Sequence, residues 1–155
     1  RSAASSASPS RGGAKSKRIR VTIVAGGVME GREWLGRSSL YAVCQVPDKP
    51  QSQFRTEVVS DTPEPQWNKS CEFDYTPPDP LEFDVHNKQQ WPRPPELLGR
   101  AVLDGERFSQ RGFDGELTLL EDDDRGRAPR NAGWLQVKVD VLGEIRGELP
   151  VAGAA

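Results

Sequence analysis

The sequence predicts an all-β protein, an eight-stranded antiparallel β-sandwich. From about residue 18 onward, apolar side chains alternate with polar ones at a period of two, as in strands that bury one face. No window carries the apolar stripe of an amphipathic helix, and the connections are rich in Pro and Gly, which separate strands and interrupt helices. Because each sheet would bury only one face, we expect two sheets packed against each other.

The strands follow from this alternation in chain order. The first is expected at residues 18–25, where Ile19, Val21 and Ile23 share one face, and the second at 40–46, after a charged loop. Pro-rich segments, such as "TPPDP" and "WPRPP", separate the later strands. The six further strands are expected at residues 54–59, 71–75, 81–85, 100–103, 116–120 and 134–141.

The two cysteines fall on the inward phase of their strands. At 155 residues, with 35% hydrophobic content, the chain is long enough for one domain with a real core. Cys44 and Cys71 are therefore expected as buried free thiols, with a cross-sheet disulfide as the alternative. Neither spacing nor composition suggests a zinc site.

Charge divides the chain into a basic start and an acidic body. Six of the 21 basic residues and none of the 23 acidic ones lie within residues 1–29. We expect residues 1–17 to be a disordered tail, 18–143 the sandwich and 144–155 a short second tail. The acid-free, Arg- and Ser-rich start resembles the remnant of an organelle transit peptide, and a solvated linker is the alternative interpretation.

An ordered series of short motifs runs through the body. Its members lie before and within the expected second strand, within the third, before and within the fourth, and before the sixth. They are Gly36, Ser38, Tyr41, Thr56, Pro65, Trp67, Asn68, Phe73, Leu98 and Gly99. In this order they resemble the C2 domain family, a calcium- and phospholipid-binding sandwich, over about residues 18–143. With the first strand at the head of the sandwich, the resemblance implies the circularly permuted type II topology.

The resemblance also gives the places of calcium ligands in two loops at one end. Those positions hold Glu33, Ser39, Asn87, Gln89 and Glu96. Calcium takes six to eight oxygen ligands, largely from carboxylates, yet only two of the five are acidic. Basic residues are interspersed, so we expect the positions to be degenerate, with no metal and no cofactor.

The same two loops offer aromatic and basic side chains instead. The resemblance places Trp34, Leu35 and Trp91 at one end, and aromatic side chains framed by arginine are typical of membrane interfaces and protein hot spots. The basic residues expected to contact a membrane or partner beside them are Arg32, Arg37, Lys88 and Arg93. Alternatively, either tryptophan folds back and caps the core. Tail contacts to anionic lipid are expected from Arg11, Lys15, Lys17 and Arg18.

The sequence does not indicate an enzyme. His86, the only histidine, is out of phase with the apolar residues of its strand and is expected to face solvent at the strand end. The leading hypothesis is a calcium-independent protein-interaction or scaffold subunit of a membrane-associated complex, on a cytosolic face or inside an organelle. A calcium-independent phospholipid-docking domain is the alternative. Nucleic-acid binding through the tail is weaker, because the body is acidic, and no nucleic acid is expected as a partner.

Overall fold

The computed structural model describes residues 16–28, 38–90, 92–121 and 128–144, and these are almost entirely strands. A single 3-10 turn, Gly105–Arg107, is the only helical element in these ranges. The strands are β2 (Lys17–Val28), β3 (Ser39–Val46), β4 (Lys49–Arg55), β5 (Val59–Ser60), β6 (Gln66–Tyr75), β7 (Leu81–Asn87), β8 (Glu96–Leu103), β9 (Phe113–Glu121) and β10 (Arg130–Glu144).

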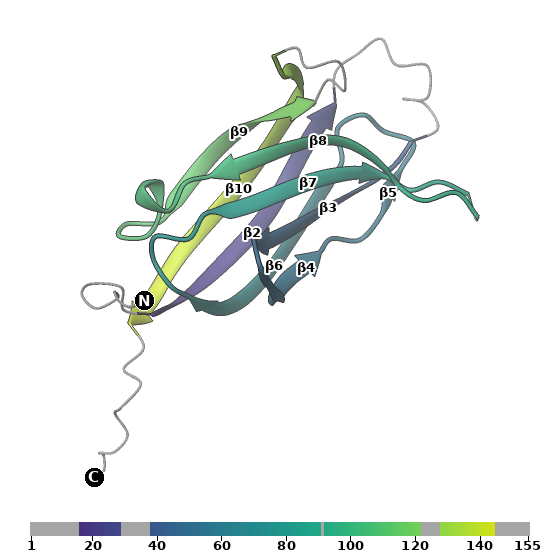
Figure 1. The fold of residues 1–155 in the computed structure, drawn as a ribbon. Coiled ribbons are helices and arrows are strands. Elements are labelled where there is room, and N and C mark those ends of the chain that lie inside the picture. The colour runs from purple at the N-terminus through teal and green to yellow at the C-terminus, as the bar shows by residue number, and fades with distance from the viewer. Residues whose placement is uncertain (1–15, 29–37, 91, 122–127, 145–155) are drawn as a thin grey trace, which may run out of the picture.

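The strands form two antiparallel layers that join along one edge. The pairing order is β4-β3-β7-β8-β9-β10-β2-β6, with the two-residue β5 added to β3. Between β8 and β9 the register holds a single pair, Arg100 with Leu120, so the path folds there into two four-stranded halves. Figure 1 shows β8, β7, β3 and β4 in front of β10 and β2. The expected all-β sandwich is confirmed.

The core lies between the two layers. Period-two alternation turns every second side chain inward, and burying apolar surface is the main favourable term in folding. The inward side chains that are at most 2% exposed include Ile19, Val21, Ile23, Leu40, Leu81, Phe83, Leu98, Leu103, Leu119, Leu135 and Val137. At one end of the core the rings of Tyr75 and Phe108 pack with centroids 4.9 Å apart.

The expected third strand, 54–59, is wrong in its position. The chain turns tightly at Pro47 and Asp48, where Asp48 has a φ of 68°, and returns as β4 directly beside β3. After β4 the hydroxyl of Thr56 accepts the Ala42 N–H at 3.0 Å and donates to the Glu57 carbonyl at 2.9 Å. The Thr56 N–H also donates to the Ala42 carbonyl at 2.9 Å, so Thr56 holds the chain against β3 between the end of β4 at Arg55 and the start of β5 at Val59. β4 contains Pro50, and because β4 is an edge strand, proline is tolerated there.

Both cysteines are free thiols, as expected, but their burial differs. Cys44 is fully buried, and burial raises the pKa of its thiol well above the usual value. Cys71 is only partly buried, because it lies on β6 at the other edge of the sheet path. The expectation of a buried thiol is therefore confirmed for Cys44 and corrected for Cys71.

Trp67 joins the start of β6 to the core. Its partly buried ring packs against the core cluster, and its indole N–H donates to the Leu40 carbonyl at 3.3 Å. A Cβ atom on Gly26 would lie 3.1 Å from the ring, so little room separates Trp67 from β2.

Trp67→Ala should lower the free energy of unfolding by about 3 kcal/mol, at the low end for buried aromatic truncations because the ring is not fully enclosed. Chemical denaturation with matched m-values is the measurement, and Trp67→Phe, which retains most of the apolar contact, should lose much less. An alanine variant as stable as the parent would contradict this packing role.

Candidate functional site

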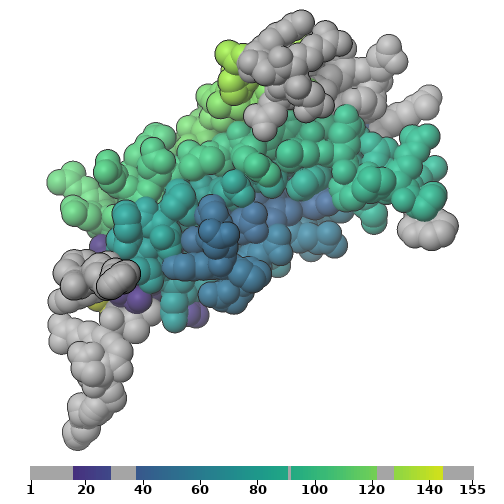
Figure 2. Space-filling view, viewed as in Figure 1, coloured from purple at the N-terminus to yellow at the C-terminus, as the bar shows by residue number. Residues whose placement is uncertain are grey.

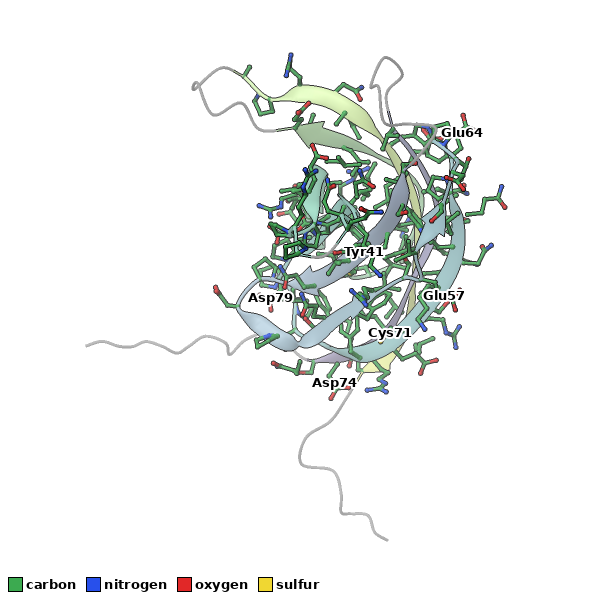
Figure 3. The ribbon with its side chains drawn as sticks, turned by 90° about the vertical axis from the view of Figure 1, so that its right-hand side faces the viewer. Tyr41, Glu57, Glu64, Cys71, Asp74 and Asp79 are labelled. Atoms are coloured by element: carbon green, nitrogen blue, oxygen red, sulfur yellow. The ribbon has the colours of Figure 1, made fainter. Side chains whose placement is uncertain are left out.

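Four strand ends form the base of one end of the sandwich. β2 ends there at Val28 and β7 at Asn87, whereas β3 begins there at Ser39 and β8 at Glu96. Antiparallel pairing of Leu40 with Asn87 and of Asn87 with Glu96 brings the last three together. We call these strand ends and the segment 61–65 the loop end. Figure 3 shows Glu64 at this end and Asp74 and Asp79 at the opposite one.

The segment 61–65 braces the loop end from outside. Its carbonyls accept two N–H groups of β2, from Gly26 to Pro65 and from Val28 to Pro63, both at 3.0 Å. The Asp61 N–H donates to the Ser38 carbonyl at 2.8 Å. The proline carbonyls remain free to accept because proline lacks only the backbone donor. The base of the first loop is thereby fixed on both sides.

Asn87 closes the centre of the loop end. Its side chain is only 6% exposed, and its Oδ1 accepts the Ser39 N–H at 2.9 Å. The Lys88 N–H in turn donates to the Ser39 carbonyl at 2.7 Å. Two positions that the resemblance had given to calcium ligands are thus connected to each other by hydrogen bonds.

The remaining degenerate calcium positions behave in the same way where they are described. Gln89 Nε2 donates to Glu96 Oε1 at 3.3 Å, so the carboxylate has a partner from within the protein. Glu33 lies outside the described residues. In the described part of the chain, no group of three or more His, Cys, Asp or Glu side chains is placed to hold a metal ion.

The expected contact residues divide between the two ends. Lys88 and Arg93 are exposed beside the loop end. Lys17 and Arg18, expected as tail contacts to anionic lipid, are the first residues of β2 at the opposite end. There Lys17 Nζ donates to the Ser109 carbonyl, and Arg18 pairs with Asp74 at 2.8 Å. The expected contacts outside the described residues are Arg11, Lys15, Arg32, Trp34, Leu35, Arg37 and Trp91.

A second feature, which the sequence did not reveal, lies on the outer face of the layer formed by β4, β3, β7 and β8. There the rings of Tyr41 and His86 stack with centroids 5.2 Å apart and planes 23° apart. The guanidinium carbon of Arg55 lies 5.2 Å from the centre of the Tyr41 ring. These three residues line a pocket of about 390 Å³, and Figure 2 looks onto the face that carries it.

The expectation that His86 is a solvent-facing strand-end residue is corrected by this stack. The histidine points outward, as its phase predicted, but it is half-buried against the Tyr41 ring. Its Nδ1 is shielded from solvent and has no hydrogen-bond partner among the described residues. This burial lowers the pKa of His86 below 6.5; the Asp84 carboxylate opposes the shift and the Arg100 guanidinium adds to it. Cross-strand pairing of Tyr41 with His86 was not visible without the register.

Comparisons with known proteins agree with this architecture. The C2 domain family model matches residues 17–119. The chain is similar to a C2 domain of plant extended synaptotagmin 1 (19% identity, TM-score 0.65, covering 84% of this chain and 97% of that one). It is also similar to a C2 domain-containing protein from a putative elicitor-responsive gene (15%, TM-score 0.68, 94% and 100%). At these identities the likeness shows the fold alone.

A third structure places the same fold within a larger protein. Human GIVD cytosolic phospholipase A2 matches at 14% identity with a TM-score of 0.64, over 83% of this chain but 17% of that one. No curated protein matches the sequence. Among the described residues, no helix has the length and apolar character needed to cross a bilayer.

Asn87→Ala should lower the free energy of unfolding by about 1–3 kcal/mol, because it leaves the partly buried Ser39 N–H without its acceptor. Faster hydrogen exchange of the Ser39 amide should accompany the loss. Gln89→Ala, which shortens a half-exposed side chain at the same end, is the control and should cost about 0.5 kcal/mol or less. Equal, small effects of both substitutions would show that the Asn87 bond does not hold the loop end.

His86 should make the fold sensitive to mild acid. Because burial depresses its pKa in the folded protein, the unfolded chain takes up a proton first as the pH falls below 6.5, and the free energy of unfolding falls with it. His86→Phe keeps a ring against Tyr41 but cannot titrate. Denaturant unfolding at about pH 7.5 and about pH 5.5 should show a smaller loss for the variant than for the parent. Identical losses would contradict the assignment.

Proposed function

Because the chain belongs to the C2 domain family, whose model matches residues 17–119, we propose that it is a non-catalytic, calcium-independent binding module. It serves as a protein-interaction or peripheral scaffold subunit of a membrane-associated complex. A C2 domain is a sandwich that binds a membrane or a protein, so this role needs no chemistry beyond docking. The organisation that we propose is a sandwich over residues 18–143 between two tails.

The observation that carries the proposal is the hydrogen bonding at the loop end. Asn87 Oδ1 is occupied by the Ser39 N–H and Glu96 Oε1 by the Gln89 amide. An amide oxygen and a hydroxyl supply weaker ligands than carboxylates for a divalent cation. Binding at this end therefore relies on the loops themselves and not on an ion held between them.

A protein partner suits the charge of the loop end better than a strongly anionic surface does. Lys88 and Arg93 are exposed there, but the acidic residues Asp61 and Glu64 are exposed on the bracing segment beside them. Attraction of basic residues to an anionic membrane is worth about 1 kcal/mol each and is offset by nearby acids. The loop tryptophans Trp34 and Trp91 then supply anchors of the kind that dominate protein interfaces.

Phospholipid docking without calcium is the second candidate, and the exposure of Lys88 and Arg93 at one end favours it. A bilayer would receive the apolar loop side chains, with the two cations at headgroup level. In either case the module lies at the periphery of a membrane.

Trp34→Ala combined with Trp91→Ala should weaken attachment to the native complex or membrane by at least about tenfold, because each well-buried anchor contributes about 2 kcal/mol. The loss should be similar at low and high salt, since apolar burial is not screened. Co-sedimentation with native membranes, and with vesicles of neutral or anionic lipid, is the measurement.

Removal of residues 1–15 is the matched control. It deletes basic residues without touching a described strand, so it should weaken attachment mainly at low salt. If the double tryptophan variant attached as the parent does but unfolded more easily, the two side chains would be caps of the core, and the proposed docking role of the loops would fail.

A further inference from the structure

We propose that the pocket on the outer face of β3, β4 and β7 binds a carboxylate of a peptide partner, with Arg55 as its anchor. This inference rests on the proposed function, because it gives the binding module a second docking surface. The pocket is lined by Tyr41, Val43, Gln53, Phe54, Arg55 and His86. It lies on the outer face of its layer, and its Tyr41–His86 pair follows directly on the Leu40–Asn87 pair at the loop end.

The register of the strands holds Arg55 in place. β3 lies between β4 and β7, with Val43 opposite Arg55 on one side and Tyr41 opposite His86 on the other. Tyr41 is only 6% exposed although it points out of the sheet, because the cation and the imidazole cover it. A guanidinium that stacks on an aromatic ring keeps its N–H donors free around its rim. The contact with Tyr41 therefore restrains the guanidinium and leaves its donors available to a ligand.

Arg55 has no carboxylate partner within the described residues, in contrast to its neighbour on this face. Arg100 donates to both oxygens of Asp84, at 2.6 and 3.2 Å, and lies 3.7 Å from Glu82. Those two acids are engaged by Arg100, so Arg55 is the cation left for a ligand. A carboxylate matches the fork of an arginine with two parallel hydrogen bonds.

The charge of the face favours a single carboxylate over a polyanionic headgroup. Arg55 and Arg100 are balanced by Glu82 and Asp84, so these four side chains sum to no net charge. His86 adds no charge near neutral pH, because burial lowers its pKa. Several cations would be needed to neutralise a multiply charged lipid headgroup. One guanidinium suffices for one peptide carboxylate.

The rest of the lining suits an apolar residue beside that carboxylate. Val43 lies opposite Arg55 and is partly buried on this outer face beside the Tyr41 ring, whereas Phe54 lies opposite the buried Cys44 and packs against the core. Gln53 supplies an amide that can bond a peptide backbone. The pocket volume of about 390 Å³ is suited to a short peptide segment and not to a whole domain. The partner is thus an acidic residue flanked by apolar ones.

The test is an NMR titration of the whole chain with capped Leu-Asp-Leu and, as the uncharged match, capped Leu-Asn-Leu. The acidic peptide should shift the Arg55 Nε–H signal and the amides of residues 41–43 and 53–55, and the asparagine peptide should bind at least about tenfold more weakly, as loss of a charged hydrogen bond predicts. Arg55→Gln should weaken binding of the acidic peptide to the same extent, and Arg55→Lys less.

Arg111→Gln is the control, because Arg111 is exposed and lies outside this pocket, in the lining of another surface hollow. It removes the same charge and should leave binding unchanged. Arg55 is exposed as well, so its variants should remain folded and melt close to the parent, with only the contact to Tyr41 lost.

Equal binding of the two peptides, no binding of either, or an equal effect of Arg111→Gln would each overturn the proposal. Sedimentation with phosphatidylcholine–phosphatidylserine vesicles gives a further test. If the chain sedimented with these vesicles, lost this binding on substitution of Arg55, and kept it in the presence of the acidic peptide, the pocket would be assigned to a membrane and the proposal would be overturned. Loss of membrane or complex attachment in the Trp34→Ala and Trp91→Ala variant tests only the docking role of the loops. The pocket can therefore fail while the proposed function stands, and the reverse also holds.

Discussion

The pairing of β2 with β10 is the interaction on which the rest of the structure depends. These two strands pair from Lys17 and Glu144 at one end to Val28 and Gly133 at the other. Their inward residues are almost completely excluded from water, so the pair forms the floor of the core under the opposite layer. Gly133 has a φ of +149°, and a Cβ atom there would collide with the Gly27 carbonyl oxygen. Only glycine permits this close approach beside the loop end.

We assign binding to two surfaces, the loop end and the pocket beside Tyr41, and both draw on β3 and β7. The loop end lies at the termini of strands, where Asn87 and Ser39 complete the hydrogen bonding that the strands leave open. The pocket lies on the outer face of the layer that contains β3, β4 and β7. Side chains on that face do not pack in the core, and they are fixed only where they pack on each other. Tyr41, His86 and Arg55 do so. The first surface is suited to apolar anchors carried by loops and the second to a charged group received by a fixed side chain.

The alternation of apolar and polar residues was enough to predict the layers and most of the core. A strand that buries one face must carry an apolar residue at every second position, so the sequence shows which side chains point inward. Ile19, Val21 and Leu135 are buried as their phase requires. The position of β4 was missed, because the turn at Asp48 and the side-chain bonding of Thr56 depend on a neighbouring strand and leave no periodic signal. The resemblance located Ser39 and Asn87 at one end of the sandwich. It did not predict the hydrogen bond between them or the stack around Tyr41, because both depend on the register of β3 and β7, which local sequence does not encode.

We propose that hydrogen bonds within the chain, and not a bound cation, complete the loop end. Thermal unfolding in chelator and in millimolar calcium tests it most directly, because a ligand that binds the folded state alone stabilises it by about 2.7 kcal/mol at a hundred times its dissociation constant. We expect the same melting temperature in both conditions. A clear rise with calcium, absent with magnesium at equal ionic strength, would contradict it.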